Sequence, residues 1–166
     1  KVTTGQALKM IILAAGYAEP EQAASHWARG YLNFALEAGM LERGEITDLD
    51  INMSRILTAK VTSRALGAAR QDLTQKFTDT NDDFVHALSE IGIIGGYPDG
   101  TFRPNAEITR AEVMEIINNV LFRTPDKDHF LDDMVTWPDN SNPNAWYYEP
   151  VQEATNSHDY ERVSNT

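Results

Sequence analysis

The chain has 166 residues, of which 42% are hydrophobic, which allows one well-buried domain or several small repeats that share a core. Its formal net charge of −11 argues against nucleic acid or an anionic membrane surface as the main partner. The absence of cysteine excludes disulfides and thiolate zinc sites, and no apolar run approaches the ~20 residues that a membrane span requires.

Apolar spacing and helix-start signals predict helices along most of the chain. The first of them begins at a capping box, in which Thr3 and Gln6 each accept a backbone N–H of the other. Glycines such as Gly16 and Gly39 provide natural helix ends. The pattern therefore predicts an all-α protein, with helices at residues 7–16, 26–41, 53–67, 84–94, 109–121 and 146–154.

The stretch 95–112 carries the densest local signals in the chain. Residues 95–104 hold glycines, an Asp-Gly pair and two prolines, which is turn chemistry. Thr109 and Glu112 then form a second capping box at the start of a helix. Arg110 takes the first helical position, where the helix dipole disfavours a cation, so we expect an ion pair or an anion site there. The predicted buried face of this helix is Val113, Ile116, Ile117, Val120 and Leu121.

These segments repeat along the chain, and the repeat is more informative than any one segment. Arg55 recurs 55 residues later as Arg110, and Thr3 recurs 106 residues later as Thr109. The offsets divide one domain, residues 1–166, into five parts. We predict the back half of a repeat at 1–17, a degenerate repeat at 22–69, a complete repeat at 77–122, a front half at 130–158 and a tail at 159–166.

One such unit cannot bury its apolar face alone, so we expect the three capped back helices to form a common core. The late front helix, near 145–157, would then pair with the first back helix and close the ring. The alternative is that the missing front half lies upstream of Lys1 and that the C-terminal segment is an addition.

The sequence at 77–122 resembles the S-layer homology family of bacterial cell-surface modules. The motif residues that carry this resemblance are Phe77-Thr78-Asp79, Gly92-Ile93-Ile94, Asp99-Gly100-Thr101-Phe102 with Pro104, and Ile108 to Glu112. The earlier unit keeps His26-Trp27 and Ser54-Arg55 but lacks the first and third of these motifs. At the chain start, Thr4 stands where the motif has arginine.

The resemblance implies three helix–loop–helix repeats around a pseudo-three-fold central three-helix bundle. It also implies an extracellular module, part of a larger surface protein, that binds secondary cell-wall polysaccharide of a bacterium. That polymer commonly carries pyruvate ketals, and the motif arginine contacts the acidic glycan in grooves between repeats. Nucleic acid and membrane insertion are not expected.

Physical chemistry agrees with this implication, because a guanidinium can grip a carboxylate through two parallel hydrogen bonds. Exposed N–H groups at a helix start favour the same anion, and aromatic rings can stack on a pyranose. The candidate ligand-binding residues are Arg110, Arg55, Thr109, Gly95, Gly96, Asp79, Asp132, Trp27 and Trp146.

Each candidate also has a structural interpretation. For Arg110 it is an ion pair with a neighbouring unit. For Asp79 and Asp132 we favour helix capping over ligand contact. For Trp27 and Trp146 we favour packing at the edge of the core. For the glycines we favour backbone conformation.

Two other classes of function compete with glycan anchoring. One is a structural or assembly module whose grooves bind protein. The other is a glycan-cleaving enzyme, although no carboxylate pair stands out as acid and nucleophile. We predict no catalytic residue and no cofactor. We also predict no metal site, because the acidic segment 79–83 lacks the glycine and terminal glutamate of an EF-hand loop.

Overall fold

The computed structural model describes residues 1–23, 25–70 and 73–156. Within these ranges all regular structure is helical, with isolated bridges but no sheet, so the all-α prediction is confirmed. The predicted tail at 159–166 and the end of the predicted front half lie outside the described residues. The helices are α1 (Thr4–Ala14), α2 (Arg29–Glu37), α3 (Arg55–Leu66), α4 (Asp83–Glu90), α5 (Arg110–Val120) and α6 (Tyr148–Thr155), with 3-10 turns at Lys127–His129 and Pro138–Asn140.

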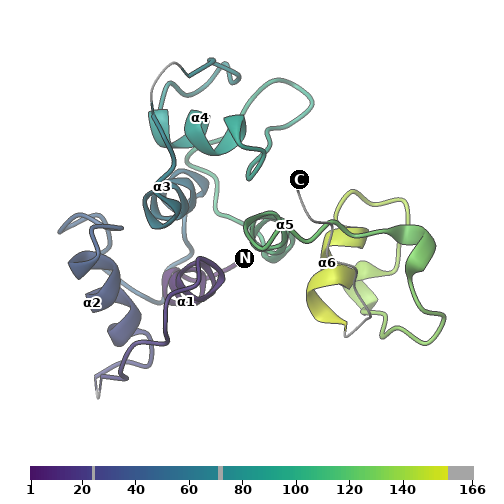
Figure 1. Cartoon of the computed structure of the whole chain (residues 1–166), viewed down its shortest axis with the longest axis horizontal. Coiled ribbons are helices and arrows are strands. Elements are labelled where there is room, and N and C mark those ends of the chain that lie inside the picture. Colours follow the sequence, from purple (N-terminus) through teal and green to yellow (C-terminus); the bar gives the residue numbers. More distant parts are fainter. Residues whose placement is uncertain (24, 71–72, 157–166) are drawn as a thin grey trace, which may run out of the picture.

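Three helices lie together at the centre of the molecule, and one outer helix flanks each of them (Figure 1). The central helices are α1, α3 and α5, and α1 contacts both of the others. The outer helices pack in the pairs α1–α2, α3–α4 and α5–α6. Each outer helix therefore packs against the central helix that precedes it in the sequence.

This pairing corrects one expectation. We expected the late front helix to pack against the first back helix, but α6 packs against α5 instead. The Asn118 side chain of α5 donates to the Pro150 carbonyl of α6 at 2.9 Å. The outer face of α1 is already covered by α2, through buried residues such as Tyr31 and Ala35. The expected ring closure is therefore wrong, and the division into repeats stays a prediction.

The starts of the central helices follow the predicted capping chemistry. Thr109 accepts the Glu112 N–H at 3.2 Å, and Glu112 accepts the Thr109 N–H at 2.8 Å, so this capping box is confirmed. Thr3 and Gln6 form the matching box at α1. The third central helix, α3, is capped by the Ser54 hydroxyl.

A ring of three backbone hydrogen bonds ties these helix starts together. The Met53 N–H donates to the Val2 carbonyl at 3.0 Å, and the Ile108 N–H donates to the Met53 carbonyl at 2.9 Å. The Val2 N–H completes the ring by donating to the Ile108 carbonyl at 3.3 Å. Each residue directly precedes a helix cap, and all three are buried. The ring joins the starts of the three central helices directly.

The core lies between the central helices and extends under the outer ones. On α5, Val113, Ile116 and Val120 are buried as predicted. Ile117 is only partly buried, and Leu121 is 39% exposed, because α5 ends at Val120 and the chain turns away. None of the helices in the described part of the chain combines the length and apolar composition needed to cross a membrane. The largest fully buried side chains are Tyr31, Phe102, Leu8, Ile11, Ile12, Met40, Met53, Leu88, Ile108, His86, Gln152 and Val61.

Candidate ligand-binding site

The loop between α4 and α5 is fixed by Asp79. Its carboxylate accepts the N–H of Phe102 at 2.7 Å and that of Arg103 at 2.8 Å. The hydrogen bond from Phe102, helped by that from Arg103, holds the pKa of Asp79 below its ordinary value. Our expectation of a helix cap here is wrong, because Asp82 directly precedes α4 and caps it through the Phe84 N–H. Asp79 braces a loop instead.

One side chain and two glycines shape the tip of this loop. Asp99 accepts the hydroxyl and the N–H of Thr101 and pairs with Arg103 at 3.0 Å, and these contacts lower the pKa of Asp99 to about 2. Gly96 has a packing role, because a Cβ atom there would come within 2.8 Å of the Thr101 carbonyl oxygen. Gly95 has open space around it, and its carbonyl accepts a hydrogen bond from Arg55 at 3.2 Å.

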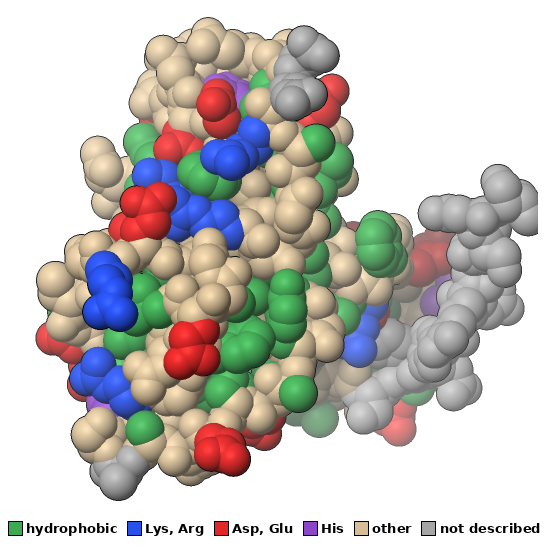
Figure 2. All heavy atoms as spheres, turned by 60° about the vertical axis from the view of Figure 1, so that its left-hand side comes forward, with side chains coloured by type: hydrophobic (Ala, Val, Ile, Leu, Met, Phe, Trp, Pro, Cys, Tyr) green, Lys and Arg blue, Asp and Glu red, His purple; other side chains and the backbone are tan. Residues whose placement is uncertain are grey.

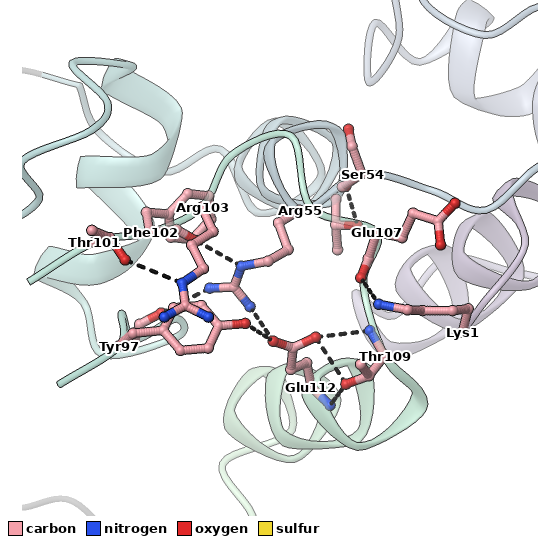
Figure 3. Close-up of polar contacts among 12 residues, drawn as sticks. Lys1, Ser54, Arg55, Tyr97, Thr101, Phe102, Arg103, Glu107, Thr109 and Glu112 are labelled. Atoms are coloured by element: carbon pink, nitrogen blue, oxygen red, sulfur yellow. Dashed lines mark hydrogen bonds and ion pairs between the residues drawn. The ribbon is translucent and has the colours of Figure 1, made fainter. Parts of the chain in front are cut away.

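Arg55, at the first position of α3, is enclosed by this loop and by α5 (Figure 3). Its Nε donates to the Phe102 carbonyl at 2.8 Å, and its Nη1 lies 2.8 Å from Glu112 Oε1. The guanidinium also lies over the rings of Phe102, at 4.5 Å, and Tyr97, at 5.1 Å. The side chain is 7% exposed, so these partners satisfy a charge that has been removed from solvent.

Glu112 is the hub of this network. Its carboxylate accepts hydrogen bonds from Arg55, from the Tyr97 hydroxyl at 2.7 Å and from the Thr109 N–H. Burial alone would raise the pKa of Glu112, but the Thr109 and Tyr97 hydrogen bonds and the Arg55 charge lower it on balance. One ionised carboxylate therefore joins α3, the loop and the start of α5.

The space between α3 and α5 is consequently small. A cavity of about 30 Å³ remains beside Arg55, which is room for about one water molecule. It is lined by Arg55, Ala59, Ile93, Ile94, Gly95, Phe102, Ile108, Glu112, Glu115 and Ile116.

A larger groove opens between α5 and α1. Its volume is about 210 Å³, and it brings together two residues singled out from the sequence, Arg110 and Trp27. Arg110 is exposed, and within the described residues no hydrogen bond or ion pair engages its side chain. Trp27 is 46% exposed, and a Cβ atom added at Gly5 of α1 would lie 3.3 Å from its indole, so packing at the edge of the core stays our prediction for this residue. The complete lining is Val2, Gln6, Lys9, Met10, Trp27, Arg110 and Met114.

The remaining two candidates lie elsewhere, in the segment that leads to α6. Trp146 is 58% exposed and contacts Tyr147 edge-on, with ring centroids 5.6 Å apart, and its packing at the edge of the core stays a prediction. Asp132 is exposed and caps none of the helices in the described residues, since Asp126 caps the nearby 3-10 turn, so our expectation of a helix cap here is wrong as well. Neither residue lines the groove that holds Arg110.

Sequence reasoning missed Lys9 and Gln6. Both project from α1 into the groove, and the 106-residue offset that pairs Thr3 with Thr109 could have located them. Lys9 Nζ lies 3.3 Å from a carboxylate oxygen of Glu19, an exposed residue that is not part of the groove lining. Figure 2 looks towards the side of α2 and shows acidic and basic side chains interspersed there.

Comparison with known proteins gives three similarities. Residues 76–114 match the family model of the S-layer homology domain. The chain is 31% identical over 154 residues to a cellulosome-anchoring protein of Acetivibrio thermocellus, a match that covers 85% of this chain and 33% of that protein. It is 29% identical over 119 residues to cell surface glycoprotein 1 of the same organism, covering 61% of this chain and 5% of that protein. The chain thus spans a third or less of these relatives, and the matches indicate a bacterial cell-surface location.

Proposed function

Because the chain contains an S-layer homology domain, we propose that it anchors a larger surface protein non-covalently to the bacterial cell wall. The ligand in this proposal is an acidic secondary cell-wall polysaccharide, such as one that carries pyruvate ketals. The binding site is the groove between α1 and α5. The names of the relatives, a cellulosome-anchoring protein and a cell surface glycoprotein, support the anchoring role.

One observation carries the choice of ligand: the groove is lined by an exposed indole and by a guanidinium that pairs with none of the described residues. Arg110 can form two parallel hydrogen bonds with a ketal carboxylate, and Lys9 adds a second positive charge nearby. Trp27 offers an apolar face for a sugar ring. The groove, at about 210 Å³, is smaller than a typical drug-sized pocket of roughly 300–1,000 Å³, which suits one acidic sugar with the polymer continuing into solvent.

The lining of the groove also favours binding over catalysis. Glycoside hydrolysis commonly requires two carboxyl groups on either side of the scissile bond. The described residues that line the groove include no aspartate or glutamate. We therefore propose a binding module without enzymatic activity.

A sedimentation assay with purified bacterial cell walls tests this function. We expect the protein to co-sediment with intact walls and to remain in solution once the secondary polysaccharide has been stripped. Arg110→Ala should abolish the binding, whereas Arg43→Ala, which removes an exposed arginine outside the groove lining, should not. Equal binding to intact and stripped walls would contradict the glycan ligand and favour an assembly module that binds protein.

A further inference from the structure

The cavity beside Arg55 and the groove beside Arg110 are built from the same helix positions. The caps Ser54, Thr109 and Thr3 set the common register. The cavity lies between the start of α3 and the third and sixth positions of α5. The groove lies between the start of α5 and the third and sixth positions of α1. In this register six residues of the cavity have counterparts in the groove. Arg55 corresponds to Arg110, Ala59 to Met114, Ile108 to Val2, Glu112 to Gln6, Glu115 to Lys9 and Ile116 to Met10.

The two sites nevertheless differ in charge at two of these positions. Beside Arg55 the neighbouring helix presents two carboxyl groups, Glu112 and Glu115. Beside Arg110 the same positions hold a neutral amide, Gln6, and a cation, Lys9. An anionic ligand would therefore be repelled at the first site and attracted at the second.

The Glu112 carboxylate also fills space that a ligand carboxylate would need. It lies 2.8 Å from Arg55 Nη1, so one face of the guanidinium fork is already occupied by an anion from the protein itself. The remaining cavity is about 30 Å³, whereas the groove beside Arg110 is about 210 Å³. The small cavity and the negative charge therefore both disfavour an anionic ligand beside Arg55.

We propose that the third residue of the neighbouring central helix selects which site accepts an anionic ligand. Glu112 acts as a built-in carboxylate that keeps the Arg55 site closed. Gln6, with Lys9 behind it, leaves Arg110 free for the carboxylate of an acidic sugar. This inference rests on the proposed function and identifies the residues that restrict it to one of the two sites.

Gln6→Glu tests the selection at the open site. Glutamate completes a capping box as well as glutamine does, so α1 should stay folded. The introduced carboxyl should pair with Arg110 as Glu112 pairs with Arg55. Binding of isolated acidic cell-wall polysaccharide, measured by calorimetry, should weaken about tenfold or more. The matched control is Gln75→Glu, which adds the same carboxyl group at an exposed position outside the groove lining, and it should bind within about threefold of wild type.

A second readout needs no ligand. In wild-type protein without polysaccharide, the Arg110 Nε–H should exchange quickly with solvent and give no persistent NMR signal, whereas in Gln6→Glu it should be protected. If wild-type protein binds no polysaccharide, the proposed function fails, but this measurement still tests the pairing. Unaltered Arg110 exchange, or Gln6→Glu binding equal to wild type, would overturn the inference.

Discussion

Arg55 and Glu112 form a buried ion pair, 2.8 Å long, between the first position of α3 and the third position of α5. Glu112 uses its other carboxylate oxygen to cap its own helix at Thr109. The pair therefore couples a contact between helices to the formation of the helix start. Breaking it should cost more than the loss of an exposed pair.

Glu112→Gln should destabilise the protein by about 3–5 kcal/mol, because buried Arg55 loses its ion-pair partner while the capping box survives. Urea unfolding at pH 7 measures the change. The control is Glu107→Gln, which alters an exposed glutamate just before α5 and should change the free energy of unfolding by less than about 0.5 kcal/mol. Equal stability of the two variants would mean that the pair adds nothing to folding.

Arg110→Ala and Arg55→Ala should have different effects on the free energy of unfolding, although the two arginines hold equivalent helix positions. Arg110→Ala removes an exposed cation from a helix start, so the free energy of unfolding should stay constant or rise by up to about 1 kcal/mol. Arg55→Ala should lower it by about 3–5 kcal/mol. Thermal melts of both variants provide the test, and a large loss of stability in Arg110→Ala would show that this arginine supports the fold.

Thr109→Ala should lower stability by about 1 kcal/mol, since the hydroxyl that accepts the Glu112 N–H is lost. Chemical unfolding quantifies the loss, and Thr124→Ala, at an exposed position after α5, serves as the reference. An unchanged midpoint for Thr109→Ala would mean that Glu112 alone holds the helix start.

The contribution of Glu112 should depend on pH. Its pKa in the folded protein lies below the ordinary value of 4.5, so the stability it adds is fully present above that pH. The contribution is lost as the pH falls through the lower, folded-state value. The stability difference between wild type and Glu112→Gln should therefore narrow between pH 7 and pH 3. Other acidic groups titrate in both proteins and cancel, so a constant difference would contradict the assignment.

The contribution of Glu115 to stability should change with pH in the opposite direction to that of Glu112. Burial raises the pKa of Glu115, so ionisation of this group works against folding as the pH rises from acid to neutral. Glu115→Gln should consequently stabilise the protein at pH 7 relative to wild type and lose that advantage in acid. Urea unfolding of the two proteins at pH 7 and at pH 4 measures the effect; a destabilised variant at pH 7 would show that Glu115 pairs productively with Arg55.

The helices and their starts could be predicted because their signals are local. The capping box of Thr109 and Glu112 spans four consecutive residues, and apolar spacing identifies the buried face behind it. The partner of α6 could not be predicted in the same way. An outer helix has the same apolar face whether it packs against the preceding or the following central helix, and only the packed structure distinguishes the two.

The site was predicted in part for a similar reason. Arg55 and Arg110 carry the same sequence signal, and the structure separates them through residues on neighbouring helices, Glu112 and Gln6. Contacts of this kind link positions far apart in the sequence, so no local sequence pattern predicts them. Lys9 escaped notice because an isolated lysine on a helix is ordinarily a solvated surface residue.

The ring of hydrogen bonds among Val2, Met53 and Ile108 has a consequence for folding kinetics. Its members are separated by about fifty residues or more, so each bond closes a long loop and raises the contact order of an otherwise helical protein. The ring cannot form until Ile108, just before the third central helix, lies next to both Val2 and Met53. We therefore expect slower, more cooperative folding than for a simple helical bundle, and exchange of these three amide protons only through global unfolding.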